Sequence, residues 1–244
     1  MTSYPNRGPH GRAVHAIAHR VVSGEHPAGA LLDPERLERE LDVSRTVVRE
    51  MLRVLAAKGM VAARPRHGTV VLPRTEWSLL DPDILRWEAD VHGSDATFLR
   101  QLAEVRGIVE PAGARLAARR RTRAELGHIE RALDAMIDAG NFGDSAVEAD
   151  LRFHRALLVA AHNDLILPME AVIETGLRTR DRLVHEEIHA DPVPSHRKLV
   201  GAIRRRAPNQ AEAAMRELLA QADRDVQRAL RRRQRTAGAD QKQP

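Results

Sequence analysis

The apolar positions of residues 33–72 recur every three or four residues and then give way to an extended run. The helix-spaced positions are Leu37, Leu41, Val47, Met51, Val54 and Leu55. This spacing predicts two short amphipathic helices, the first opened by Asp33 and Pro34 and the second capped by Ser44. Gly59 ends the second helix, and the residues after it predict a two-stranded hairpin that turns at His67 and Gly68. We therefore expect a winged helix-turn-helix.

Helical spacing also dominates the rest of the chain. A helix is expected over residues 11–23, and a series of helices begins at Ser94 with the stripe Phe98, Leu102, Val105 and Val109. Further helices are expected over 165–183, 194–206 and 209–230, joined by short loops. Short loops make neighbouring helices antiparallel. The fold class expected is mainly α: an N-terminal winged helix-turn-helix followed by a C-terminal antiparallel all-α helical bundle.

Breaks in these patterns suggest where the domains begin and end. Residues 1–10 and the basic tail 231–244 are expected to be disordered, residues 11–73 to form the winged domain, and residues 94–230 the helical domain. Residues 74–93 are expected to connect the two. Their segment WSLLDPDILRW is apolar for a connector, so Trp77 and Trp87 are expected to pack against a neighbouring domain or subunit rather than form an aromatic ligand site.

The composition narrows the class of protein. Of the 244 residues 43% are apolar but only 2% aromatic, so the core has to be aliphatic, which favours an all-α protein. The absence of cysteine excludes disulfides and thiolate metal sites and leaves nitrogen and oxygen ligands. Because no stretch of 18 uncharged apolar residues occurs, we expect a soluble cytoplasmic protein with no membrane partner.

The formal net charge of +5 is concentrated in the first part of the chain. Residues 1–75 carry 12 Lys and Arg against 7 Asp and Glu, whereas residues 76–244 carry 27 of each. Within that second part the tail from residue 231 has five basic residues and one acid, which leaves residues 76–230 at −4. A basic head suits contact with nucleic-acid phosphates, and the acidic body argues against a second nucleic-acid surface.

Four polar side chains share the exposed side of the second predicted helix: Arg45, Thr46, Arg49 and Arg53. The arginines are spaced four residues apart and therefore form a positive ridge that fits the major groove of DNA, where arginine pairs bidentately with guanine. The alternative is an ordinary solvated face on which Arg49 pairs with Glu50 or Glu40. The basic residues at the predicted hairpin tip favour the DNA-binding interpretation.

The segment PERLERELDVSRTVVREMLRVLAAKGMV, followed by HGTVV, resembles the DNA-binding domain of the GntR family of bacterial transcription regulators. The resemblance covers about sixty residues. It implies double-stranded operator DNA as partner. It also implies DNA contacts from one arginine on the helix opened by Asp33 and Pro34, from the start and middle of the helix capped by Ser44, and from the hairpin tip. The positions implied are Arg36, Arg45, Thr46, Arg49, His67 and Gly68.

Asp150 and His154 are candidate metal ligands in the helical part. They lie four residues apart, so they share one face of a predicted helix and can reach a single ion. The alternative is an ordinary contact between neighbouring turns of the helix, because such pairs occur without a metal.

The segments EVRGIVEPAGARLAARR, EADLRFHRALLVAAHNDLI and SHRKLVGAIRRR resemble the FCD effector domain of the FadR branch of the GntR family. The resemblance implies a divalent metal, with zinc as the expected ion, held by Asp150, His154 and His196. The fourth family ligand falls on Leu218, which cannot ligate. Two alternatives therefore remain: three protein ligands completed by water or effector, or a metal-free site that binds effector through hydrogen bonds.

The same resemblance implies an effector site. It places Arg106 in a central cavity, where its guanidinium can grip a carboxylate; the alternative is a surface pair with Glu110. Asn163 either lines the same pocket or caps the next helix. The whole arrangement looks closest to repressors of sugar-acid catabolism, the galactonate-responsive kind, and so implies a small organic acid as effector.

The letters HEEIH at residues 185–189 match the H-E-x-x-H pattern of zinc peptidases. The match is followed at once by Ala190, Asp191 and Pro192, which end a helix where a peptidase helix continues. We therefore expect no peptidase activity.

These observations predict a homodimeric regulator, not an enzyme. A small carboxylic or sugar acid bound in the helical domain would release it, as a repressor, from its operator. The alternative is a metal-dependent hydrolase that uses Asp150, His154 and His196.

Overall fold

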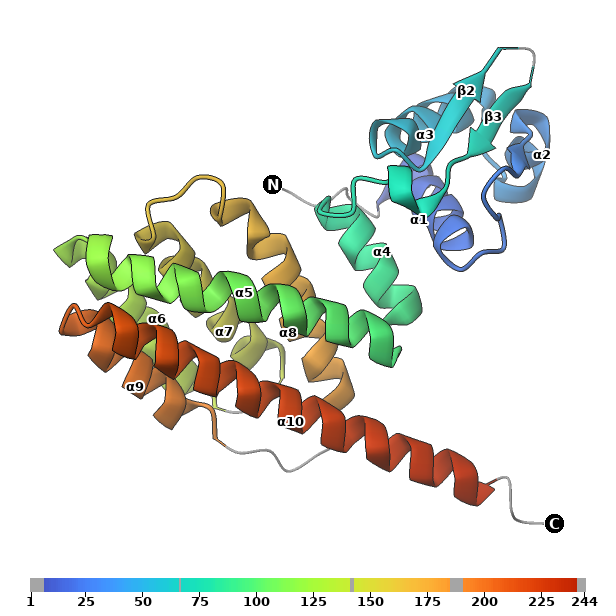
Figure 1. Ribbon diagram of the computed structural model, residues 1–244. Coiled ribbons are helices and arrows are strands. Elements are labelled where there is room, and N and C mark those ends of the chain that lie inside the picture. The colour runs from blue at the N-terminus through green and yellow to red at the C-terminus, as the bar shows by residue number, and fades with distance from the viewer. Residues whose placement is uncertain (1–6, 66, 141–142, 185–190, 241–244) are drawn as a thin grey trace. The chain divides into compact units, whose positions relative to one another are not determined.

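The computed structural model describes residues 7–65, 67–140, 143–184 and 191–240 (Figure 1). The chain divides into two compact units, Met1–Gly93 and Ser94–Pro244. Each unit has its own buried apolar core. No helix in the described ranges has both the length and the apolar character needed to cross a bilayer.

The first unit is a winged helix-turn-helix, as the sequence predicts. Its helices are α1 (Gly8–Val22), α2 (Pro34–Leu41) and α3 (Arg45–Ala57), and its strands are β1 (Leu31–Leu32), β2 (Val61–Arg64) and β3 (Gly68–Val71). The strands form one antiparallel sheet in the order β1-β3-β2, in which Arg64 pairs with Gly68 across the hairpin and Leu31 pairs with Val70. The short strand β1 was not predicted, because two residues are too few to show an alternating pattern.

The predicted capping residues Asp33 and Ser44 begin α2 and α3. The Asp33 carboxylate accepts a hydrogen bond from the Glu35 amide at 3.0 Å, and the Ser44 hydroxyl accepts one from the Val47 amide at 3.4 Å. Between the two helices Asp42 adopts a left-handed conformation with φ of 50°, which aspartate tolerates better than most residues. These local preferences place α3 across α2, with its charged side exposed.

Residues 74–93, expected to be a connector, form part of the first unit. A 3₁₀ turn at Arg74–Glu76 is followed by α4 (Pro82–His92), which packs against α1. Trp87 is fully buried, and its indole Nε1 donates to Nδ1 of His15 at 3.0 Å. Trp77 Nε1 donates to the Leu72 carbonyl oxygen at 3.0 Å. Both tryptophans therefore pack on the body of the winged domain, residues 11–73, as expected for packing against a neighbouring domain.

The second unit is an all-helical bundle. It contains α5 (Ala96–Arg120), α6 (Arg123–Ala139), α7 (Asp144–Ala160), a 3₁₀ turn (Leu167–Met169), α8 (Glu170–Val184), α9 (Val193–Arg204) and α10 (Pro208–Asp240). The long helices α5 and α10 run side by side, with α6, α7, α8 and α9 behind them in the view of Figure 1. The buried apolar residues are mostly aliphatic; the exceptions include Phe98 on α5 and Phe153 on α7, of which Phe153 is fully buried. This burial fixes which face of α7 points inward.

Both ends of the chain are more helical than the sequence predicts. Helix α10 continues to Asp240, through the segment 231–240 that was expected to be a disordered tail, and α1 already begins at Gly8. Arginine, alanine and glutamine are good helix formers, and no proline interrupts residues 209–240. Residues 1–6 and 241–244 lie outside the described ranges.

Candidate functional site

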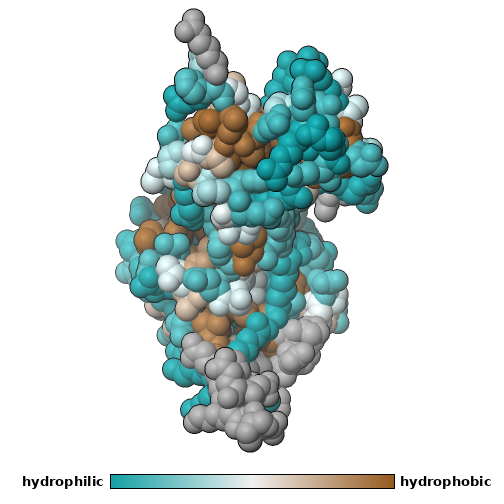
Figure 2. Space-filling view, turned by 90° about the vertical axis from the view of Figure 1, so that its right-hand side faces the viewer, coloured by the Kyte–Doolittle hydropathy of each residue, from teal (hydrophilic) through white to brown (hydrophobic). Residues whose placement is uncertain are grey.

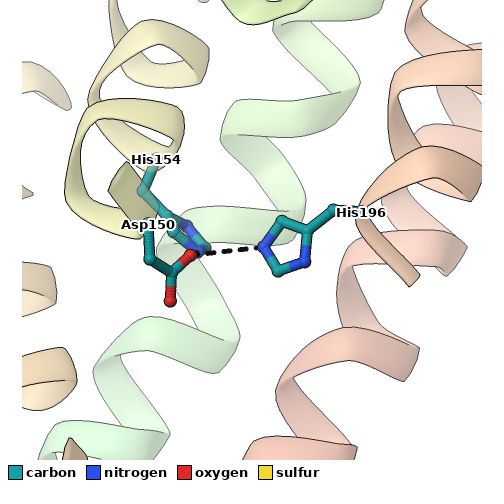
Figure 3. Close-up of side chains that lie close together, drawn as sticks. All are labelled: Asp150, His154 and His196. Carbon is teal, nitrogen blue, oxygen red and sulfur yellow. Dashed lines mark ion pairs between the residues drawn. The ribbon is translucent and has the colours of Figure 1, made fainter. Parts of the chain in front are cut away.

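Asp150, His154 and His196 converge in the interior of the second unit (Figure 3). Asp150 and His154 lie one turn apart on α7, and His196 faces them from α9. The Asp150 Oδ1 atom is 3.3 Å from Nε2 of His154 and 3.3 Å from Nε2 of His196. The two imidazoles are only 2% and 1% exposed. The three residues therefore offer one oxygen and two nitrogens to a common point shielded from water.

The geometry of this cluster fits a metal ion. None of the three facing atoms makes an aligned hydrogen bond within the described part of the chain, although all three are buried. Such orphaned atoms are costly unless something else satisfies them. Metal–ligand bonds of about 2.0–2.1 Å place neighbouring ligands of a tetrahedral site about 3.3 Å apart, which is the separation of Asp150 from each histidine. A borderline-soft divalent ion such as zinc accepts this nitrogen and oxygen set.

A second layer of contacts orients both imidazoles. His196 Nδ1 lies 2.8 Å from the Pro192 carbonyl oxygen; because a carbonyl only accepts, Nδ1 carries a proton, and Nε2 is the nitrogen that faces Asp150. His154 Nδ1 contacts the Glu110 carboxylate. Glu110 lies on α5, is 2% exposed, and accepts from Arg106 Nε at 2.6 Å through its other oxygen. A buried chain of charges thus runs from Arg106 to Asp150.

The metal-free network is held together by charge. Burial opposes ionisation of Glu110, but Arg106 and His154 outweigh it and lower the pKa of Glu110 to about 2. Burial likewise opposes ionisation of Asp150, but the two histidines hold its pKa well below its usual value. Burial disfavours protonated His154, yet the carboxylates of Glu110 and Asp150 raise its pKa to about 9. A proton on His154 therefore neutralises the site when no cation is bound.

The chelated protein should lose thermal stability as the pH rises. His154 titrates at about 6.5 when unfolded and about 9 when folded, so its contribution is complete below pH 6.5 and is lost as the pH rises through 9. Glu110, lowered from 4.5 to about 2, contributes fully above pH 4.5. We expect the melting temperature in EDTA to fall by several degrees between pH 6.5 and 9. His154→Gln should remove this fall; the same pH dependence in that variant would contradict the assignment.

Leu218, at the position of the missing fourth ligand, is a core residue. Its side chain is 8% exposed and belongs to the same apolar cluster as Leu199 and Met215. Among the described residues the cluster therefore has three protein ligands. A space of about 50 Å³ lies beside Asp150, enough for water or a ligand oxygen. The HEEIH match at 185–189 falls outside the described residues.

Arg106 lies in the interior rather than on the surface. The predicted pair with Glu110 exists, but both side chains are buried. Arg106 lines a cavity of about 410 Å³ between α5, α8 and α10, and its Nη2 has no hydrogen-bond partner in the described chain. Gly176 on α8 makes room for it, because a Cβ there would lie 2.9 Å from Arg106 Cδ. The Arg106 guanidinium is thus buried and leaves one nitrogen without a hydrogen-bond partner among the described residues.

Asn163 has a local structural role. Its side-chain oxygen accepts from the Leu165 amide at 3.0 Å and so stabilises the turn before the 3₁₀ segment 167–169. It does not line the cavity that contains Arg106. An effector contact by Asn163 stays a prediction.

Sequence reasoning missed two residues of this region. Glu110 was considered only as a surface partner of Arg106, and Arg180 was not considered. Arg180 lines both the large cavity and the small space beside Asp150. Neither has a sequence signal, because their neighbours come from other helices: His154 on α7 for Glu110 and Asp225 on α10, at 3.2 Å, for Arg180.

The exposed side of α3 forms one wall of a hollow in the first unit. Arg45, Thr46 and Arg49 line this hollow of about 480 Å³ together with Ala63 and Thr69 of the wing. All three α3 side chains are exposed. The ion pair predicted as an alternative is present but loose, since Arg49 Nε lies 3.7 Å from Glu50. The hollow is therefore bordered by cations that remain open to a ligand.

The other DNA-contact candidates lie around this hollow but do not line it. Arg36 on α2 has a side chain 69% exposed and pairs with Glu40 at 2.5 Å. His67 and Gly68 form the exposed hairpin tip, where Gly68 has a φ of +79°. Hydrophilic residues predominate on the face of the molecule drawn in Figure 2, with apolar patches between them.

Comparison with known proteins identifies both units. Residues 9–71 match the bacterial regulatory proteins of the gntR family, and residues 101–221 match the FCD domain. The galactonate operon transcriptional repressor of Escherichia coli K12 is 33% identical over 217 residues, which cover 87% of this chain and 94% of the repressor. The HTH-type transcriptional regulator LutR of Bacillus subtilis is 31% identical over 217 residues, which cover 80% of this chain and 90% of LutR.

Solved structures share the fold. Lar of Listeria monocytogenes superimposes with a TM-score of 0.59 at 18% identity over 91% of this chain and 98% of Lar. McbR/YncC of E. coli superimposes with a TM-score of 0.52 at 16% identity over 91% of this chain and 98% of McbR/YncC. The sequence relatives above are named as regulators and lend no support to the hydrolase alternative. The chain is a DNA-binding transcription regulator of the GntR family, with an N-terminal winged helix-turn-helix and a C-terminal ligand-binding FCD domain.

Proposed function

We propose that the protein is a homodimeric repressor that leaves its operator when a small carboxylic or sugar acid binds in the FCD domain. The observation that carries this proposal is the buried centre of Asp150, His154 and His196, joined through Glu110 to Arg106. A ligand-binding domain that buries cationic and metal-ligating groups suits an anionic, oxygen-rich effector. The similarity to the galactonate operon repressor supports a sugar acid.

The DNA-binding end of the proposal rests on the hollow beside α3. Arg45, Thr46 and Arg49 would enter the major groove, Arg36 would add a phosphate contact, and the wing tip at His67 and Gly68 would reach the backbone. One copy covers too few base pairs to select a site in a genome. Two copies on a palindromic operator double the number of base contacts, which is why we infer a homodimer.

The effector end combines one arginine with one metal site. Asp150, His154 and His196 would hold zinc, which supplies a positive charge to which a carboxylate or hydroxyl oxygen of the effector binds. The three-ligand shell suits this role, because Leu218 leaves a coordination position that the protein does not fill. Arg106, fixed by Glu110 and Gly176, would offer its free Nη2 to the effector carboxylate.

Effector release is testable on a duplex selected from random sequences by the protein itself. We expect affinity for this duplex to fall at least tenfold between 50 and 200 mM salt, because cation–phosphate contacts release counterions. Saturating galactonate or a related sugar acid should weaken binding a further five- to 150-fold, the usual range of allosteric coupling. Fluorescence anisotropy measures both effects. Absence of any preference over an unrelated duplex would contradict the DNA-reading proposal, and tighter binding with every acid would contradict the release mechanism.

A further inference from the structure

Lys58, which ends the recognition helix α3, is enclosed by two carboxylates from the segment that follows the wing. Its Nζ lies 2.8 and 2.9 Å from the two carboxylate oxygens of Asp81 and 2.7 Å from Oδ2 of Asp83. The side chains of Lys58 and Asp83 are only 12% and 7% exposed. Asp81 caps α4, and Asp83 lies in its first turn. We call these three residues the Lys58 clamp.

The backbone reinforces the clamp at the same end of α3. The Ser78 amide donates to the Lys58 carbonyl oxygen at 3.0 Å. Gly59, with a φ of +75°, lies so close to the following segment that a Cβ there would be 2.4 Å from the Glu76 carbonyl oxygen. Only glycine fits at this position. Residues 76–83 are therefore fastened to the end of α3 by side chains and by main chain.

The far side of the clamp is anchored to α1 through α4. Arg86 donates from Nη2 to Oδ1 of Asp83 at 2.8 Å. One residue further on, the buried Trp87 donates to His15 of α1, and Lys58 Nζ lies 5.8 Å from the centre of the Trp87 ring. Lys58 and Arg86 balance the charges of Asp81 and Asp83, so this partly buried cluster is neutral as a whole. The end of α3 is thus connected to the rigid core of the domain.

Stability alone does not explain a buried ion cluster. Well-packed apolar residues of the same volume usually stabilise a fold as well or better, because charges lose their hydration on burial. An ion cluster differs from apolar packing because its hydrogen bonds depend on distance and angle. The Lys58 ammonium group is satisfied only when three carboxylate oxygens surround it at hydrogen-bond distance. The clamp therefore defines the position of Lys58 more narrowly than apolar packing would.

We propose that Asp81 and Asp83 are positioning residues for operator recognition, which hold the carboxyl end of α3 and so set the tilt at which α3 enters the major groove. The proposal rests on the base-reading role proposed for α3. Both residues lie beyond the gntR match at residues 9–71. They touch no base; they act through Lys58.

The length of α3 makes its tilt matter. Its 13 residues span about 20 Å, so a rotation of about 5° around the carboxyl end displaces the amino end, with Arg45 and Thr46, by more than about 1 Å. Hydrogen bonds to base edges tolerate only a few tenths of an ångström. The attraction between an arginine and a phosphate charge tolerates a far larger displacement of the side chain. Loosening the clamp should thus weaken specific binding and leave non-specific binding nearly unchanged.

The test is Asp83→Asn in the full-length protein, on a duplex selected in vitro by the wild type and on an unrelated duplex of equal length. We expect affinity for the selected duplex to fall about tenfold, with affinity for the unrelated duplex unchanged within about twofold and the same salt slope. Glu88→Gln is the matched control, because Glu88 lies on the same helix, is 4% exposed and pairs with Arg74 at 2.8 Å instead of with α3. Glu88→Gln should leave the ratio of the affinity for the selected duplex to that for the unrelated duplex as it is in the wild type.

Several outcomes would overturn the proposal. One is that Asp83→Asn leaves the affinity for both duplexes unchanged. Another is that it weakens both affinities by the same factor, as a partly unfolded sample would. Lys58→Met combined with Asp83→Asn should be no worse than the poorer single variant, and additive losses would also count against the clamp. If Asp83→Asn does not fold, Asp81→Asn should show about a threefold loss on the selected duplex alone. A wild type without any preference contradicts the proposed function instead.

Discussion

His196→Ala is expected to abolish zinc binding by the FCD domain. In the proposed site His196 would supply one of three protein ligands, from a helix different from that of Asp150 and His154. Without it the remaining pair on α7 offers two ligand atoms, as many solvent-exposed helix pairs do, and affinity should fall more than 100-fold. Asp150→Asn should have a similar effect, because it removes the negative charge that lies 3.3 Å from both imidazoles.

The measurement is the rise in melting temperature when zinc is added to chelated protein. A ligand at 100 times its dissociation constant stabilises the folded state by about 2.7 kcal/mol, which shifts the melting temperature of a chain of this size by about 5–10 °C. The wild type should show this shift and His196→Ala should not. The shift, rather than the absolute melting temperature, is compared because the substitution also creates a cavity in the core.

His128→Ala is the matched control. His128 lies on α6 of the same unit, is exposed, and is not part of the cluster. Its replacement should leave the zinc-induced shift unchanged. An equal shift in the wild type and in His196→Ala, or no shift in the wild type, would rule out the metal centre and leave the hydrogen-bonding alternative.

The local features of the fold followed from the sequence because they depend on neighbouring residues. The caps at Asp33 and Ser44 and the apolar stripes of the long helices are properties of segments of four to fifteen residues. The pairing of Asp150 with His154 is of the same kind, since a single helical turn places them together. His196 was implied only by the family resemblance, because spacing within one helix says nothing about a residue on another.

Tertiary contacts account for what the sequence did not reveal. Glu110 is spaced to pair with Arg106, but nothing local indicates that both are buried or that Glu110 also meets His154. In the same way the apolar character of residues 77–87 predicted packing but not its partner. Lys58 and Asp83, which are 25 residues apart, came together only in the fold. In this chain the sequence pattern therefore did not predict the buried polar networks, because their members come from different helices.

The double replacement Arg45→Ala with Arg49→Ala is expected to eliminate specific operator binding. Both side chains line the hollow between α3 and the wing, both are exposed, and Arg49 has only a loose contact with Glu50. A bidentate contact between an arginine and a base contributes about 1–3 kcal/mol, so losing two should weaken binding by at least about 30-fold. Fluorescence anisotropy with the selected duplex measures this loss of affinity. The salt slope should fall by about one phosphate equivalent for each of the two arginines that also contacts the DNA backbone.

Two further substitutions separate base reading from loss of charge. Arg123→Ala removes an exposed arginine from the FCD domain and should change affinity less than about twofold, because it lies outside the proposed DNA surface. Arg53→Ala should weaken operator binding less than Arg45→Ala or Arg49→Ala alone, since Arg53 Nη1 is already paired with Glu50 at 2.8 Å. If Arg53→Ala instead cost as much as Arg49→Ala, the carboxyl half of α3 would also face the bases, which would contradict docking through the amino half of the recognition helix.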